Sequence, residues 1–144
     1  MKVQSILGVK GTTVATVQPI STVAEAVALL REHGIGALVV SNDGQHVDGI
    51  VSERDIVRRL ADDGLGVLES SVAEVMTAEV TTCSPNDTVD ELMALMTELR
   101  IRHVPVVVDG RLQGVVSIGD VVKAHVSHLV TENQAMHDYI TTGR

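Results

Sequence analysis

The pattern of apolar and polar positions along this chain occurs twice. Residues 22–58 return as residues 88–123 after an offset of about 66 residues, and a fixed internal period of this kind indicates two copies of one supersecondary unit. The correspondence holds residue by residue, and Asp55 of the first unit matches Asp120 of the second. We call the units copy one and copy two, and we expect their sites to be similar.

Within each copy the apolar spacing predicts a strand, a helix, a β-hairpin and a second helix. In copy one these are strands at 14–17, 38–41 and 49–52 and helices at 22–33 and 55–61. In copy two they are strands at 80–83, 104–108 and 112–117 and helices at 88–99 and from 120 to about 139. The predicted fold class is therefore α/β of the α+β kind, with two β-α-β-β-α repeats that pack through their sheets about a pseudo-twofold axis.

Both long helices are predicted to begin at a capping box, Thr22-x-x-Glu25 in copy one and Thr88-x-x-Glu91 in copy two. In this motif the hydroxyl and the carboxylate each accept a hydrogen bond from a backbone N–H at the helix start. These helix starts are therefore well defined by sequence.

Three parts follow from this pattern: residues 1–66 hold the first repeat with an N-terminal segment, 67–126 the second repeat, and 127–144 a C-terminal helical tail. The last helix carries an apolar stripe that neither repeat covers, formed by Val126, Leu129 and Val130. An isologous contact with a second subunit would cover it, so we predict a homodimer. The alternative is that the helix folds back on its own copy.

The composition of the chain argues against some classes of binding partner. The net charge of −8 argues against nucleic acid or an anionic membrane, since both need a cationic surface. No apolar run approaches the length of a membrane span, and no signal peptide is evident at the start. The single cysteine, Cys83, cannot form an internal disulfide, so we expect a cytoplasmic protein.

The motifs after each long helix are GIGALVV with GIVSERD in copy one, and IRHVPVVVDG with GVVSIGD in copy two. With them the chain resembles a tandem pair of CBS (cystathionine β-synthase) domains, a Bateman module of the stand-alone bacterial type, over about residues 7–126. The resemblance implies a regulatory protein in signal transduction, with clefts between the repeats for adenosine-containing ligands: AMP, ADP, ATP, NAD or S-adenosylmethionine. It implies no catalytic cofactor, and it leaves the downstream protein unidentified.

The resemblance gives the ribose to the aspartates of Ser52-x-x-Asp55 and Ser117-x-x-Asp120. A carboxylate is an acceptor that can take both hydroxyls of a ribose diol. The same spacing is also a capping box that needs no ligand. Both roles can hold at once, with the serines as caps and the carboxylates turned toward the cleft.

Phosphate requires positive charge or backbone N–H groups, and the copies differ in what they supply. Copy two has Arg102 and His103 where copy one has Gly36 and Ala37, while copy one has Arg54 where copy two has Gly119. If the copies face each other, these cationic groups converge near the phosphates, a task that suits the bidentate guanidinium. The alternatives are an ordinary ion pair with Glu53, Asp55 or Asp120 for the arginines, and a structural role for the histidine.

For the adenine, the resemblance implies walls made by the first strand of a copy and the GIGA or RHVP segment. The residues are Val14, Gly36 and Ala37 for the first site, and Val80, Val104 and Pro105 for the second. The same residues are equally compatible with a plain hydrophobic core.

Catalytic and metal sites are not predicted. His125 and His128 with Glu132 have a spacing that could bind a metal, but a solvated helical face explains it better. Cys83 has no recognisable base, and a nucleotide hydrolase would need a paired acid and base that the sequence lacks. We therefore predict a nucleotide-binding regulator that is not an enzyme, with a protein-interaction scaffold whose clefts are empty as the alternative.

Overall fold

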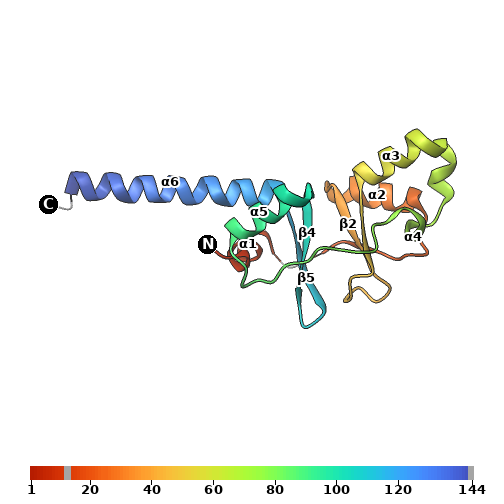
Figure 1. The fold of residues 1–144 in the computed structure, drawn as a ribbon, viewed down its shortest axis with the longest axis horizontal. Coiled ribbons are helices and arrows are strands. Elements are labelled where there is room, and N and C mark those ends of the chain that lie inside the picture. The colour runs from red at the N-terminus through yellow and green to blue at the C-terminus, as the bar shows by residue number, and fades with distance from the viewer. Residues whose placement is uncertain (12–13, 143–144) are drawn as a thin grey trace.

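The structure is a computed structural model that describes residues 1–11 and 14–142 of the 144-residue chain (Figure 1). Its elements are α1 (Val3–Lys10), β1 (Thr16–Val17), α2 (Val23–His33), β2 (Ala37–Val40), β3 (Gly49–Ser52), α3 (Glu53–Asp63), the 3-10 helix η1 (Gly64–Glu69), α4 (Val72–Val75), α5 (Val89–Leu99), β4 (His103–Val108), β5 (Arg111–Ser117) and α6 (Ile118–Thr142).

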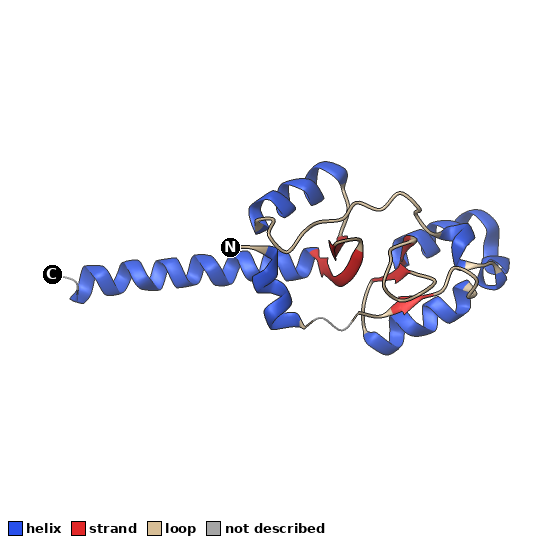
Figure 2. Ribbon diagram, turned by 90° about the horizontal axis from the view of Figure 1, so that it is seen from below, coloured by secondary structure: helices blue, strands red, loops and turns tan. Residues whose placement is uncertain are grey.

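The two sheets lie side by side in the middle of the molecule, and the helices lie outside them. Figure 1 shows α2, α3 and α4 on the copy-one side and α1, α5 and the start of α6 on the copy-two side, and Figure 2 shows the same separation from below. The predicted pairing of two sheet-and-helix repeats is confirmed. The greater part of α6 extends away from this body.

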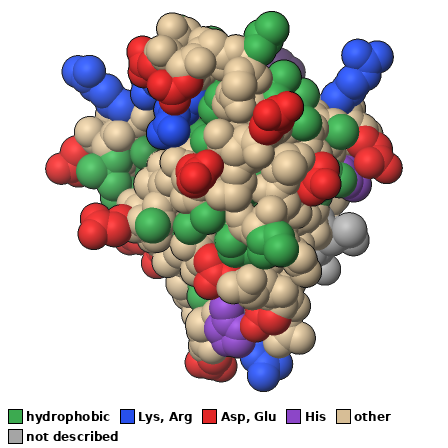
Figure 3. Space-filling model, turned by 90° about the vertical axis from the view of Figure 1, so that its right-hand side faces the viewer, with side chains coloured by type: hydrophobic (Ala, Val, Ile, Leu, Met, Phe, Trp, Pro, Cys, Tyr) green, Lys and Arg blue, Asp and Glu red, His purple; other side chains and the backbone are tan. Residues whose placement is uncertain are grey.

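The outer end of copy one has a mixed surface. Carboxylates are scattered over the face in Figure 3, with apolar side chains exposed between them. Within the described ranges, no helix combines the length and the apolar character that crossing a membrane requires.

Both long helices begin as predicted. Thr22 Oγ1 accepts from Glu25 N at 3.2 Å while Glu25 Oε2 accepts from Thr22 N at 3.3 Å, and Thr88 and Glu91 repeat the motif at 3.0 and 3.3 Å. The capping boxes are thereby confirmed, and they fix where α2 and α5 begin relative to the sheets.

The two long helices end differently. α2 is followed by the C-cap Gly34, with a φ of 62°, whereas α5 is followed by the equivalent Arg100, with a φ of 55°. The left-handed conformation costs a residue with a side chain roughly 1–2 kcal/mol, and glycine adopts it freely. Copy two therefore tolerates strain at Arg100, and this position carries a cationic side chain.

The two sheets differ in their third strand. In copy one, β1 runs parallel to β2 with Thr16 opposite Val39, and β2 and β3 form the predicted hairpin. In copy two, β4 and β5 form the hairpin, but the strand predicted at 80–83 is reduced to one parallel bridge between Cys83 and Val106. Pro105 lacks the N–H that would extend the pairing upstream of Cys83.

Other boundaries also depart from the predictions. α3 begins at Glu53, directly after the cap Ser52, rather than at residue 55. The predicted boundary between the repeats, at residues 66 and 67, lies inside the 3-10 helix η1, whose Val67 is buried in the copy-one core. α6 spans Ile118–Thr142, slightly beyond the predicted range at both ends.

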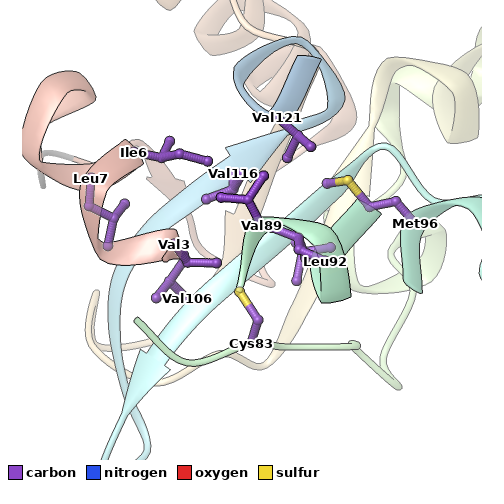
Figure 4. Packing of buried hydrophobic residues seen from close by; sticks show 11 residues of the cluster. Val3, Ile6, Leu7, Cys83, Val89, Leu92, Met96, Val106, Val116 and Val121 are labelled. Atoms are coloured by element: carbon purple, nitrogen blue, oxygen red, sulfur yellow. The ribbon is translucent and has the colours of Figure 1, made fainter. Parts of the chain in front are cut away.

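The segments that precede the copies are exchanged in space. α1, which precedes copy one, packs in the copy-two core, and Figure 4 shows Val3, Ile6 and Leu7 against residues of α5, β4 and β5. α4, which precedes copy two, packs in the copy-one core. Residues 1–66 are therefore one repeat by sequence, but their first helix belongs to the other core.

Glycine at one position of each second hairpin strand permits this exchange. A Cβ on Gly114 would lie 2.6 Å from Leu7 Cδ2, and a Cβ on Gly49 would lie 2.5 Å from Met76 Sδ. Leu7 belongs to α1 and Met76 follows α4, so each leading segment is seated directly on the strand of the opposite copy.

Candidate functional site

A cleft of about 240 Å3 lies between the two copies. Its walls come from the start of β2, the β3–α3 junction, the crossing segment around Val80, and the residues between α5 and β4. Both copies are needed to form it. The structure thus brings the SERD motif of copy one against the RH pair of copy two.

Asp55 lies at the β3–α3 junction and lines the cleft. Its Oδ2 accepts from Ser52 N at 3.0 Å and from Ser52 Oγ at 2.9 Å, while Asp55 N donates to Ser52 Oγ at 3.2 Å. The capping box is therefore present. Among the described residues Oδ1 has no hydrogen-bond partner, so one carboxylate oxygen is available to a ligand.

Four arginines line the same cleft as three carboxylates. The arginines are Arg54, Arg58, Arg100 and Arg102, and the carboxylates are Glu53, Asp55 and Glu79. In a chain with a net charge of −8, this is a local concentration of guanidinium groups. Such groups bind phosphate through paired hydrogen bonds.

Arg54 and Arg102 come from different copies, and the structure brings them to one cleft. Within the part of the chain that the structure describes, neither forms an ion pair with Glu53, Asp55 or Asp120. The ion-pair alternative is therefore not realised. Both guanidinium groups remain available to an anion.

The imidazole of His103 in copy two lies against Gly36 of copy one. A Cβ on Gly36 would lie 3.3 Å from His103 Cε1 and Nε2, so a larger residue there would press on the imidazole. A backbone hydrogen bond of 2.9 Å from Glu53 N to Gly36 O holds that glycine against the start of α3.

The imidazole of His103 is held neutral. Burial, followed by the positive charge of Lys10, lowers the pKa of His103 below its ordinary value. Glu53 and Asp120 oppose this shift, and Arg102 adds to it. At neutral pH His103 can thus donate one N–H to a ligand but does not supply the full positive charge that its position suggested.

Aliphatic side chains form the apolar wall of the cleft. They are Ala37, Ile50, Val80 and Ile101. The structure places Val80 with Asp55, whereas the sequence pattern assigned it to the site of Asp120. The reason is the path of the chain. Thr77 forms a bridge with Ile50 of copy one, and the segment after it crosses to copy two, where Cys83 forms a bridge with Val106.

Three other predicted wall residues lie elsewhere. Val104 is fully buried in the copy-two core, and Pro105 is buried beside it in β4. Val14 is half-buried ahead of β1. For Val104 and Pro105 the plain core role accounts for the burial.

At the equivalent junction of copy two, the aspartate forms an ion pair with a lysine of α1. Asp120 Oδ2 accepts from Ser117 N at 2.9 Å and from Lys10 Nζ at 2.7 Å, and Lys10 Nζ also donates to Val115 O at 2.7 Å. Burial raises the pKa of Asp120, but the bonds from Lys10 and Ser117 outweigh it and the net pKa lies below its ordinary value. The two predicted ribose carboxylates are therefore not equivalent.

The remaining candidates have structural surroundings. Cys83 is buried in the copy-two core, and burial raises the pKa of its thiol to about 11. His128 pairs with Glu132 along α6 at 3.3 Å. Among the described residues, no three metal-ligating side chains gather into a potential metal site.

A family model for the CBS domain matches residues 9–62 and again residues 72–127. The chain belongs to the CBS domain family. The two matches coincide with the two copies, so the cleft described above is the space between two CBS repeats.

One curated relative is the mitochondrial CBS domain-containing protein CBSX3 of Arabidopsis thaliana, 41% identical over 126 residues. The match covers 85% of this chain and 61% of that protein, so the chain spans about three-fifths of its length. The crystal structure of the CBS-domain containing protein ATU1752 from Agrobacterium tumefaciens is 46% identical, with a TM-score of 0.84 over 87% of this chain and 99% of that one. CBS-pair proteins are generally regulatory rather than catalytic.

Another solved structure shows a CBS pair with ligands. The CBS domain pair of protein MJ0100, in complex with 5′-methylthioadenosine and S-adenosyl-L-methionine, is 26% identical with a TM-score of 0.79, over 89% of this chain and 98% of that one. That CBS pair binds adenosine compounds.

Sequence reasoning missed two of the cleft arginines. Arg58 lies one helical turn after Arg54, so the period of α3 could have placed both on one face. Arg100 stands where copy one has the helix-ending Gly34, and an arginine at a position that favours glycine was a detectable signal.

Proposed function

We propose that this CBS protein is a regulatory sensor that binds an adenosine-containing ligand in the cleft between its repeats. Asp55 Oδ1 accepts the ribose hydroxyls, and the adenine lies against Ala37, Ile50 and Val80. The phosphates of AMP, ADP, ATP or NAD lie toward Arg54 and Arg102, with His103 as a neutral donor. The cleft is the observation that supports this. It joins an aliphatic wall to a carboxylate oxygen and to guanidinium groups from both repeats that have no partner among the described residues.

The output is a change in stability and in the relative position of the repeats. A ligand held by Asp55 of copy one and Arg102 of copy two bridges the two cores. Binding to the native state alone stabilises it by mass action, by about 2.7 kcal/mol at 100 times the Kd. A downstream protein that reads this change completes the signal.

We propose binding without turnover, in a reducing compartment such as the cytoplasm. The charged groups along the cleft are four guanidinium groups and three carboxylates, with the imidazole of His103 beside them. They suit the recognition of charge and of a diol, and they do not pair a nucleophile with a base.

The test is a thermal-unfolding series with AMP, ADP, ATP, NAD and S-adenosylmethionine on the wild type, Asp55→Ala and Asp62→Ala. Asp62 is an exposed carboxylate near the end of α3 and serves as the matched control. Each midpoint is compared with that of the same protein without ligand, because Asp55→Ala also removes a cap worth about 1 kcal/mol.

We expect a ligand to raise the midpoint of the wild type and of Asp62→Ala by roughly 5–15 °C at 100 times its Kd. The shift should be lost in Asp55→Ala. Absence of a shift with every ligand would reject the sensor and favour the scaffold with empty clefts.

A further inference from the structure

Beyond Val121, the large apolar side chains of α6 lie on the surface of the described molecule. Val121 is fully buried in the copy-two core, but from Val122 onward the large apolar side chains are exposed. Figure 1 and Figure 2 show the helix extending beyond both repeats. In proteins, most of the stability of a helix comes from packing of its apolar face, and this part of α6 packs none of its large apolar side chains in the described residues.

Five of the exposed large apolar residues of α6 beyond Val121 follow a heptad. In order they are Val122, Val126, Leu129, Met136 and Ile140, which are 49%, 52%, 49%, 66% and 59% exposed. The other two, Val130 and Tyr139, flank this seam at positions e and g. With Asn133 included, the spacing alternates strictly between four and three residues. This period of 3.5 residues is the signature of a coiled-coil seam.

The side chains at the two seam positions indicate the number of strands. Val126, Asn133 and Ile140 occupy position a, and Val122, Leu129 and Met136 occupy position d. Among parallel coiled coils, β-branched residues at a with Leu at d, as at Val126, Ile140 and Leu129, favour two strands over three or four. A second α6 is therefore a better match for this seam than a groove of different chemistry.

Asn133 distinguishes the two possible orientations. In a parallel pair each a residue faces the same residue of the second helix, so two Asn133 amides can hydrogen-bond to each other. In an antiparallel pair with the same overlap, Asn133 faces Leu129, and its buried amide has no partner. An unsatisfied buried amide costs about 1–3 kcal/mol, so the parallel pair is favoured.

The seam is on a different face of α6 from the side chain that packs in the core. Successive helical residues are about 100° apart, so the seam beginning at Val122 lies about a quarter turn from the face that Val121 packs into the core. A second helix can approach the seam without displacing the contacts of α6 with α1, α5 and β5.

We propose that α6 forms a parallel two-stranded coiled coil with α6 of a second copy of this chain, with Asn133 setting the register. This defines the geometry of the homodimer and is independent of the ligand in the cleft. Parallel pairing places both bodies at the same end of the coiled coil.

The experiment uses the full chain with single cysteines introduced along α6. Asn133→Cys places a thiol at position a, and Thr131→Cys places one at the opposite, f position as the control. Native Cys83 is buried and present in both. The a positions of a parallel pair lie within disulfide range, and the f positions do not.

Under mild oxidation we expect Asn133→Cys to give a covalent dimer and Thr131→Cys to give none. Sedimentation of the wild type should show twice the 15.3 kDa of one chain, and Leu129→Glu should be a monomer with the circular dichroism of a folded protein. A monomeric wild type at 100 µM would overturn the proposal. So would a dimer that does not cross-link at residue 133, because that result indicates a different orientation, or equal cross-linking at residue 131.

Discussion

Lys10 Nζ lies 2.7 Å from Asp120 Oδ2, across 110 positions of sequence. The contact joins the end of α1 to the β5–α6 junction of copy two. The residue that matches Lys10 after the 66-residue offset is Met76, which packs on β3 of copy one and has no charge. Asp55 of copy one therefore has no equivalent lysine beside it, and it lines the cleft. The ion pair therefore distinguishes the site of Asp120 from the site of Asp55, although the sequence repeat predicts that the two sites are similar.

The contribution of the Lys10–Asp120 pair to the free energy of unfolding should be lost at acidic pH. The pKa of Asp120 is depressed in the folded state, so its contribution is present above the unfolded pKa and is lost as pH falls through the folded pKa. Lys10→Met should lower the unfolding free energy at pH 7 by less than about 1 kcal/mol, since both side chains are partly exposed. Urea unfolding at pH 7 and pH 3 checks this, and an equal effect at both values would contradict it.

His103 should give opposite pH effects with and without ligand. Its pKa is depressed in the folded protein, so the unliganded protein should lose stability as pH falls below about 6.5, where the unfolded chain binds the proton first. A phosphate-bearing ligand beside the ring favours the imidazolium, so its affinity should rise over the same range.

Calorimetric titration between pH 7.5 and pH 5.5 measures the second effect. His103→Gln should flatten both curves, because glutamine keeps a donor but does not titrate in this range. Affinity of the wild type that is unchanged or weaker at pH 5.5 would argue against His103 next to the phosphates. The groups that face the ring, Lys10, Glu53, Asp120 and Arg102, remain in place in this variant.

Arg54 and Arg102 should contribute to the binding of ligands that carry phosphate and much less to the binding of adenosine. Arg54→Ala and Arg102→Ala should each weaken ATP binding by roughly 10–100-fold, since a hydrogen bond to a charged group contributes about 1.5–3 kcal/mol. Binding of adenosine should change much less. Arg111→Ala, on the exposed hairpin of copy two, is the control for loss of positive charge. Equal losses for ATP and adenosine would place these arginines away from the phosphates.

Arg100 should lower the stability of the fold while adding a positive charge to the cleft. Arg100→Gly relieves the left-handed backbone and should raise the unfolding free energy by about 1 kcal/mol, while it removes a cleft cation and weakens ATP binding. Gly34→Ala, at the equivalent end of α2, should lower stability by a similar amount. Chemical denaturation of both variants tests the pair, and a destabilised Arg100→Gly would show that the side chain makes contacts that outweigh the strain.

Much of the fold follows from local sequence signals. Thr22-x-x-Glu25 and Thr88-x-x-Glu91 define helix starts because a capping box is a contact over three residues. The hairpins follow from short apolar runs joined by turn residues. The convergence of Arg54 and Arg102 follows only if the two copies face each other, and the structure places both arginines in the cleft between the copies.

The rest depends on contacts between distant segments. The sequence period gives no sign that α1 packs on copy two, so neither the Lys10–Asp120 pair nor the place of Val80 beside Asp55 could be predicted. The lost third strand in copy two depends on one missing N–H at Pro105, which matters only once the register with Cys83 is known. The neutral state of His103 depends on burial between the copies.

The most direct test of the central claim is a crystal structure of the wild type grown with the adenosine compound that stabilises it most in the ligand series. We predict density in the cleft between the repeats, with both ribose hydroxyls within hydrogen-bond distance of Asp55 and any phosphates beside Arg54 and Arg102. A cleft without ligand density, or the ligand bound elsewhere on the chain, would contradict the account.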